Sequence, residues 1–450
     1  MNWLRSGLAV VLCGSGLAAA AADDWPQWLG PQRDGIWRET GILEKFPPGG
    51  PKVKWRVAIA GGYSGVAVAG DRLILMDRQL GEGAKVQDEK AIPHRPPGSI
   101  AGNERITCFN AHTGEQLWQH VYDCPYTVSY PAGPRCTPIV AGGKVYTLGT
   151  EGHLHCLDLV NGRVLWSKNF NTDYQAKAPL WGHSAHPLLD GQRLICMVGG
   201  PGSAVVAFDK DTGAELWRNL TAPEVGYCPP TLIELDGQRQ LVVWHAAGVN
   251  GLEPESGKEL WGHAFRTYQN MAIATPRLVG DKLFITGYPT TAFLFRLQSQ
   301  PPAAEIVWKG DRKTGFFSCF ATPFEVDGYL YGGDKGGKLV CIKLETGERM
   351  WESLDWAGGR SRNTGGDLFL TRVGASNRFF MFTELGDLYM VRLSPSGLEE
   401  IDKAHLLEPT GVGFGKDVVW NAPAYAHRCI YVRNDKELIC FSLAAEAGSE

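Results

Sequence analysis

The chain has 450 residues, 44% of them apolar, and its 44 basic and 48 acidic side chains give a formal charge of -4. A charge this close to neutral provides no basic surface for nucleic acid, and the apolar content is ordinary for a globular protein. The 56 glycines, 27 prolines and 15 tryptophans favour many short strands joined by turns.

The N-terminus has the features of a secretory signal peptide. Arg5 supplies a positive charge, an apolar run extends from Leu8 to Ala21, and small residues precede Asp23. The pattern predicts a signal peptide over 1–22 and export to the periplasm or the outside of a bacterial cell. The run is short for a membrane anchor, and no later stretch approaches a transmembrane segment. Cys13 follows Leu12, not a small residue, so the pattern does not favour a lipoprotein.

After an N-terminal extension at residues 23–51, one short pattern recurs along the chain. Its fullest copy reads Thr-Gly-Ala-Glu-Leu-Trp at 212–217. The tryptophans that end the copies are separated by 48, 51, 44, 47 and 43 residues. A period of that size is typical of a repeat architecture.

Residues 138–170 show what one repeat builds. Four apolar segments are separated by Gly-Gly, Glu-Gly and Asn-Gly pairs. Such pairs allow the positive φ angles of tight hairpins, so the repeat predicts a four-stranded antiparallel sheet. A sheet with two apolar faces can bury both only between copies of itself, which predicts the blades of a propeller. We expect a tryptophan of each blade to pack on the neighbouring blade, against the backbone that a turn glycine exposes.

Counting the repeats gives eight blades. The seventh, which begins at Asp367, has no tryptophan, and the eighth ends at Leu443 without a final strand. The missing strand is present at 52–57, so we expect the N-terminal strand to close the ring by completing the last blade. The prediction is an all-β, eight-bladed propeller over 52–443, with a loop insertion at 79–103 in the first blade and a tail at 444–450. The residues expected to join the blades are Trp55, Trp118, Trp166, Trp217, Trp261, Trp308 and Trp351, with the turn glycines Gly114, Gly162, Gly213, Gly257 and Gly347.

The spacing Ala207-x-Asp209-x-x-x-Gly213-x-x-x-Trp217 resembles the tryptophan-docking repeat of the quinoprotein family. That family includes pyrroloquinoline quinone (PQQ) dehydrogenases and a propeller component of the outer-membrane β-barrel assembly machinery. The resemblance implies the fold and says little about activity, because the repeat is a scaffold in all of these proteins.

Motifs for catalysis are sparse. No two cysteines are adjacent and no C-x-x-C-H haem motif occurs, although both features are found in dehydrogenases that the sequence resembles. We therefore expect a non-catalytic, monomeric binding or scaffold protein, with no cofactor, whose partner is an envelope or extracellular protein or glycan, or a small ligand. The alternative is a PQQ-dependent sugar or alcohol dehydrogenase that holds the quinone with calcium.

Candidate binding residues lie in the segments that lead into the first strand of each blade. These segments meet on one face, where a cluster of polar and aromatic side chains is typical of a ligand site. His183 and His186 lack the neighbours of a metal site, so no metal is expected. The alternative is that these side chains only bond the ends of neighbouring strands. The candidates are Tyr63, Arg135, Trp181, His183, His186, Asn270, Arg360, Arg362, Asn363, Trp420 and Asn421.

The cysteines favour packing over covalent links. Four of them occupy the same place in different repeats, which indicates small buried groups. Cys124 and Cys136 flank one loop, and they are the pair whose positions would allow a disulfide. The four equivalent cysteines are Cys108, Cys156, Cys341 and Cys440.

Overall fold

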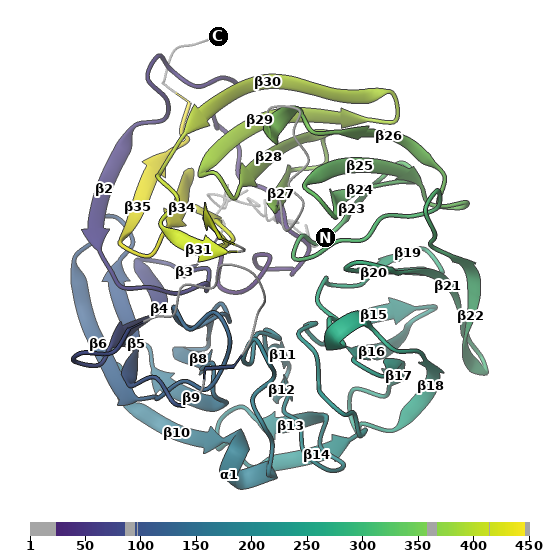
Figure 1. Ribbon diagram of the computed structural model, residues 1–450, viewed down its shortest axis with the longest axis horizontal. Helices are drawn as coiled ribbons and strands as arrows, with labels where there is room; N and C mark the ends of the chain where they lie inside the picture. Colours follow the sequence, from purple (N-terminus) through teal and green to yellow (C-terminus); the bar gives the residue numbers. More distant parts are fainter. Residues whose placement is uncertain (1–23, 86–94, 97, 358–366, 414, 446–450) are drawn as a thin grey trace, which may run out of the picture.

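The computed structural model describes residues 24–85, 95–96, 98–357, 367–413 and 415–445. Eight four-stranded antiparallel sheets form a ring (Figure 1), which confirms the predicted eight-bladed propeller. Among the described residues, no helix has the length and apolar character needed to cross a bilayer.

Each blade is a meander whose first strand lies nearest the axis. Blades 1 to 4 comprise β3–β6 (Ala67–Ala69, Arg72–Leu80, Gly102–Asn110, Gln116–Asp123), β7–β10 (Ile139–Ala141, Lys144–Leu148, His153–Asp158, Val164–Asn169), β11–β14 (Leu188–Asp190, Arg193–Met197, Val205–Asp209, Glu215–Asn219) and β15–β18 (Thr231–Leu235, Gln238–His245, Gly248–Leu252, Glu259–Ala264).

Blades 5 to 7 comprise β19–β22 (Arg277–Val279, Lys282–Gly287, Thr291–Ser299, Pro302–Lys309), β23–β26 (Phe324–Val326, Tyr329–Asp334, Lys338–Lys343, Arg349–Ser353) and β27–β30 (Leu368–Val373, Arg378–Thr383, Asp387–Ser394, Gly397–His405). Short elements between blades are α1 (Phe170–Tyr174), η1 (Tyr268–Asn270), η2 (Asp355–Ala357) and the hairpin β31–β32 (Gly411–Gly413, Lys416–Val418).

The eighth blade joins the two ends of the chain. Its strands are β33 (Ala424–Ala426), β34 (Cys429–Arg433), β35 (Glu437–Ser442) and β2 (Val53–Ala58). Trp55 of β2 lies opposite Cys440 of β35 in an antiparallel pair. The predicted closure of the ring by the N-terminal strand is therefore confirmed.

The repeated tryptophans make the same contact from blade to blade. At the junction of blades 1 and 2, Trp118 Nε1 donates a hydrogen bond to the carbonyl of Leu159 (2.9 Å). Its indole lies so close to Gly162 that a Cβ there would be 2.4 Å from the ring, and the φ of this glycine is +72°. Glycine is thus required both by the close approach and by the backbone angle. Equivalent indole donations join Trp55 to Ala111, Trp166 to Lys210, Trp217 to Pro254, Trp308 to Leu344 and Trp351 to Ser394.

Trp261 departs from this pattern. Its Nε1 donates to Gln240 Oε1 (2.7 Å) in its own blade, and its ring lies against Gly251. Ala304 occupies the place of the turn glycine in the next blade, four residues before Trp308. Trp261 still belongs to an apolar cluster that includes Phe295 and Ala304 of blade 5, but its indole N–H is bonded within blade 4.

The N-terminal extension is part of the propeller, which the sequence did not indicate. We call residues 24–37 the strap. Trp25 forms a β-bridge with Val68 of blade 1, and β1 (Ile36–Trp37) adds a parallel fifth strand to blade 7. Between these ends the strap forms hydrogen bonds with three other blades. The carbonyl of Pro26 accepts from the backbone N–H of Val140 in blade 2, and Arg33 donates to the carbonyl of Pro187 at the start of blade 3. The carbonyl of Asp34 accepts from the side chain of Arg277 in blade 5. The purple ribbon near the centre of the ring in Figure 1 belongs to this N-terminal region.

Two smaller expectations are modified by the structure. The strands of the first blade pair as far as Leu80 and Gly102, so residues 79, 80, 102 and 103 belong to the sheet and not to the insertion; residues 86–94 and 97 lie outside the described residues. Cys124 and Cys136 are both free, because they lie in different apolar clusters. Cys124 Sγ faces His153 Nδ1 at 3.6 Å, whereas Cys136 Sγ contacts the carbonyl of His183 at 3.7 Å.

Candidate functional site: an aromatic pocket on the axis

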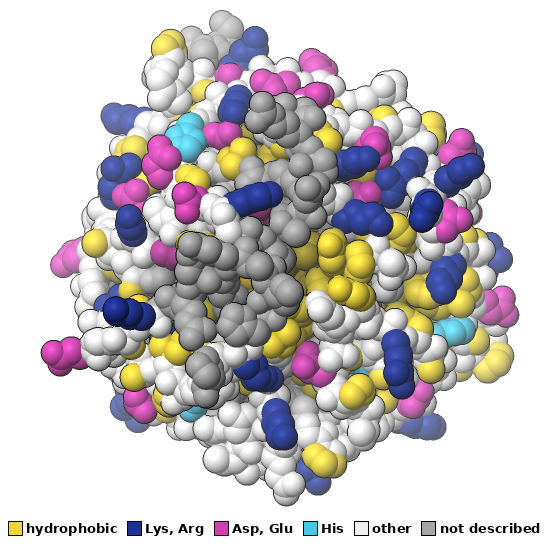
Figure 2. Space-filling model, viewed as in Figure 1, with side chains coloured by type: hydrophobic (Ala, Val, Ile, Leu, Met, Phe, Trp, Pro, Cys, Tyr) yellow, Lys and Arg dark blue, Asp and Glu magenta, His cyan; other side chains and the backbone are white. Residues whose placement is uncertain are grey.

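A pocket of about 180 Å³ lies on the propeller axis. Residues from the lead-in segments or first strands of all eight blades line it, together with Trp28 of the strap. We call it the axis pocket. In Figure 2, hydrophobic side chains gather near the centre of the ring, over blades 5 and 6. The lining residues are Trp28, Tyr63, Gly65, Tyr130, Arg135, Trp181, Ser184, His186, Tyr227, Pro229, Met271, Ile273, Cys319, Phe320, Thr322, Phe369, Trp420 and Ala422.

The strap closes one end of the axis pocket. Along the first strand of blade 1, Gly65 lines the pocket and Val68, three residues further, pairs with Trp25. Blade 7 repeats the arrangement, since Phe369 lines the pocket and Arg372 pairs with Ile36. The indole of Trp28 stacks on His186 with 4.1 Å between ring centroids and 7° between planes.

Aromatic rings form most of the remaining wall. Trp420 meets Phe320 and Tyr130 edge to face, with centroids 5.3 and 5.5 Å apart. On another side, Trp181 lies 5.4 Å from Tyr227. Edge-to-face pairs are favourable arrangements of aromatic quadrupoles, so these rings hold one another in place around the pocket.

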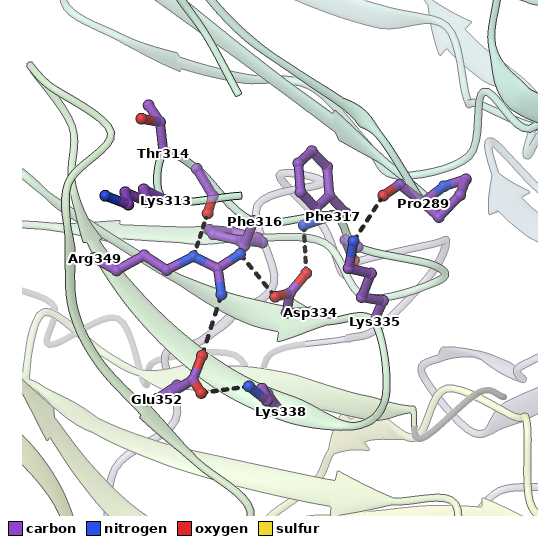
Figure 3. Close-up of polar contacts among 12 residues, drawn as sticks. Pro289, Lys313, Thr314, Phe316, Phe317, Asp334, Lys335, Lys338, Arg349 and Glu352 are labelled. Carbon is purple, nitrogen blue, oxygen red and sulfur yellow. Dashed lines mark hydrogen bonds and ion pairs between the residues drawn. The ribbon is translucent and has the colours of Figure 1, made fainter. Parts of the chain in front are cut away.

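Acidic residues at the ends of second strands position the lead-in segments. In blade 6 (Figure 3), Asp334 accepts a hydrogen bond from the backbone N–H of Phe317 (2.7 Å) and pairs with Arg349 (2.8 Å). This bond anchors the segment that carries Phe320 into the pocket. In blade 8, Trp420 Nε1 donates to Glu384 Oε2 (3.2 Å), which orients the indole.

Arg135 lines the pocket, and its hydrogen bonds go to the chain itself. The guanidinium has five N–H groups. Nε donates to the carbonyl of Trp181 (2.8 Å), Nη2 donates to the carbonyls of Ser129 (2.9 Å) and Tyr130 (2.5 Å), and Nη1 donates to the carbonyl of Gly133 and to Thr150 Oγ1. All five N–H groups are thus engaged, and Arg135 braces the loop between blades 1 and 2.

The predicted site residues fall into three groups. The structure brings Tyr63, Arg135, Trp181, His186 and Trp420 together in the axis pocket. Three others do not line it: His183 is buried against Phe170, Asn421 donates to the carbonyl of Gly62 (2.8 Å), and Asn270 belongs to η1. Arg360, Arg362 and Asn363 lie outside the described residues.

Sequence reasoning missed Trp28, Tyr130, Tyr227, Phe320 and Phe369 among the lining residues. Trp28 belongs to the stretch Asp-Trp-Pro-Gln-Trp-Leu-Gly at 24–30, and such a concentration of aromatic residues in an extension was an available signal that it is buried. Tyr227 and Phe369 lie in a lead-in segment and a first strand, at positions equivalent to those of the candidate binding residues in other blades.

The buried histidines are neutral. His186 Nδ1 accepts a hydrogen bond from the backbone N–H of Thr137 (2.9 Å), so the ring carries its proton on Nε2. Burial, and then the charge of Arg33, hold the pKa of His186 well below its usual value. Burial lowers the pKa of His183 to about 4. In the part of the chain that the structure describes, no three His, Cys, Asp or Glu side chains are grouped to hold a metal ion.

These neutral histidines predict acid-sensitive stability. Burial also lowers the pKa of His155 to about 3, whereas an unfolded histidine titrates near 6.5. Below pH 6.5 the unfolded chain therefore binds more protons than the folded chain, and stability falls progressively towards pH 4. For each such histidine, the free energy of unfolding should be about 2 kcal/mol lower at pH 5 than at pH 8.

Urea unfolding of the purified protein at pH 8 and pH 5 would measure this loss. The His155→Gln variant should lose less stability between the two pH values than the natural chain. An unfolding free energy that is constant from pH 8 to pH 5 would contradict the prediction.

Comparison with known proteins gives one family. A family model described as outer membrane protein assembly factor BamB matches residues 102–353. Polyvinylalcohol dehydrogenase of Sphingopyxis sp. (strain 113P3) is 25% identical over 410 residues, which cover 74% of this chain and 59% of that protein. Outer membrane protein assembly factor BamB of Kangiella koreensis is 29% identical over 118 residues, which cover 26% of this chain and 27% of that protein. The chain thus matches less than two thirds of the length of either relative.

Among solved structures, quinohemoprotein alcohol dehydrogenase from Comamonas testosteroni superposes with a TM-score of 0.58 at 12% identity. The superposition covers 94% of this chain and 81% of that one. At this identity the likeness extends to the fold alone.

Proposed function

This chain belongs to the PQQ-repeat propeller family whose model is described as outer membrane protein assembly factor BamB, and from that premise we propose that it is a non-catalytic binding or scaffold protein of the bacterial envelope. The axis pocket is the observation that carries the proposal. Its walls are mainly aromatic, and all N–H groups of the Arg135 guanidinium donate hydrogen bonds to the chain itself. A pocket of this kind suits binding better than acid–base chemistry, which needs a titratable group poised near the working pH.

Location and partner are parts of the same proposal. The signal peptide expected at 1–22 lies outside the described residues, and we propose that the mature chain works as a monomer in the periplasm or outside the cell. The partner is an envelope or extracellular protein or glycan, or a small ligand. A pull-down from envelope extract should recover a specific protein or glycan.

A PQQ-dependent dehydrogenase is the second candidate, favoured by the likeness to polyvinylalcohol dehydrogenase over 74% of the chain. The described residues fit that cofactor poorly. PQQ is a planar polycarboxylate that needs cationic or N–H donors, and its calcium needs several oxygen ligands. All five N–H groups of Arg135 are already bonded to the chain, so this guanidinium has no donor left for a carboxylate of the quinone.

A cofactor titration separates the two candidates. We expect micromolar PQQ with Ca²⁺ to change neither the absorbance spectrum of the quinone nor the melting temperature of the purified protein. Turnover of alcohols or sugars with an artificial electron acceptor should also be absent. Saturable PQQ binding together with measurable turnover would overturn the scaffold proposal.

A further inference from the structure

We propose that the axis pocket binds one small, neutral aromatic molecule of the size of indole or phenol. The inference deepens the proposed function and rests on it, because it takes the axis pocket to be the binding site. It follows from the size of the pocket, from its aromatic walls, and from the lack of a charged side chain in the described lining that is free to bind a ligand.

The volume corresponds to a single ring system. An engineered protein cavity of about 150 Å³ lined by Leu, Ile and Phe side chains stays dry and binds benzene. The axis pocket, at about 180 Å³, is only slightly larger. An indole or a phenol fits within this volume.

The walls offer ring faces and edges on several sides. Trp28, Trp181 and Trp420 are each half-buried, so part of each indole borders the pocket. A planar ring among them makes stacked or edge-to-face contacts, which stabilise aromatic pairs beyond the area they bury. An aliphatic ligand of equal volume would gain burial without these contacts.

Charged ligands are disfavoured. Every N–H of Arg135 already has an acceptor in the chain, and Tyr227 Oη donates to Glu224 (2.9 Å). His186 is neutral, and burial raises the pKa of the Cys319 thiol well above its usual value. A carboxylate in the pocket would lose water and gain no N–H donor from Arg135, which is costly.

Calorimetric titration of the purified, cofactor-free protein tests the proposal with indole as the probe. Indole should bind saturably at one site and at least ten times more tightly than benzoate or cyclohexanol. N-acetyl-tryptophanamide represents the same ring as a side chain of a partner polypeptide. If it binds more tightly than indole, a polypeptide is the occupant and the small-molecule proposal is wrong.

Two pocket variants and one control locate the site. Ala422→Phe should fill the pocket and abolish indole binding, and Trp420→Ala should weaken it about ten-fold. Tyr268→Ala, at an exposed position in the neighbouring η1, should bind indole like the natural chain. Melting curves of all three variants would show that they are folded.

Absence of indole binding by the folded natural chain, or equal binding by Ala422→Phe, would overturn the proposal. Neither result bears on whether the chain is catalytic. That question is decided by the PQQ titration and turnover assay, so failure of the ring proposal and failure of the scaffold proposal remain distinguishable.

Discussion

Trp55→Ala should destabilise the protein by about 3–5 kcal/mol, the usual cost of truncating a buried tryptophan. Trp55 lies in the strand that completes blade 8, and its indole packs on Gly114 and donates to Ala111 in blade 1 (3.0 Å). Its loss removes a contact across the junction where the ring closes. Urea unfolding at neutral pH would measure the change, and Val53→Ala, at an exposed position of the same strand, is the matched control.

Removal of residues 1–60, which takes away β2 together with the strap, should have a larger effect. A chain that begins at Gly61 leaves the edge of β35 without its partner, and an exposed edge strand promotes aggregation. It also removes the carbonyl of Ala60, to which Arg433 donates at 2.7 Å. We expect aggregation or loss of the cooperative melt. A soluble chain lacking residues 1–60 that melts within a few degrees of the mature protein would contradict the position of the closure.

Trp37→Ala should cost about as much, roughly 3–5 kcal/mol. Trp37 is fully buried, with its ring centroid 5.2 Å from that of Tyr425 in blade 8 and 5.8 Å from that of Phe380 in blade 7. The change opens a cavity between blades 7 and 8. Thermal and urea unfolding would measure it, with Gln32→Ala, at an exposed position of the strap, as the control.

The strap also makes the N-terminal extension important for the stability of the propeller. Deletion through Gly50 should be mild if the extension is a simple lead, yet the strap places Trp25 and Trp37 in the core and adds β1 to blade 7. We now expect this deletion to lower the melting temperature strongly and to open the axis pocket at the end that Trp28 closes. An unchanged melt would show that the strap contributes little to stability.

The sequence by itself determined the blades, their number and their closure. Those features depend on local patterns: the alternation within strands, the Asn-Gly and Thr-Gly turns, and the period between tryptophans. Each blade contacts only its neighbours, so a repeat identified once predicts the contact of Trp118 with Gly162 and of its counterparts. Trp261 shows the limit of this reasoning, since its indole N–H donates within its own blade and the next repeat has Ala304 in the place of the turn glycine.

Only the tertiary structure decided the path of the strap and the character of the axis pocket. Arg33 reaches Pro187 and Asn421 reaches Gly62 across 154 and 359 residues of sequence, and no period in the chain records such contacts. Residues of several lead-in segments, among them Tyr63, Arg135 and Trp181, line this pocket. Arg135 has no N–H group free for a ligand, because folding brings four backbone carbonyls and the hydroxyl of Thr150 to its guanidinium. Hydrogen-bond saturation is a property of positions in space, and residue type alone does not specify it.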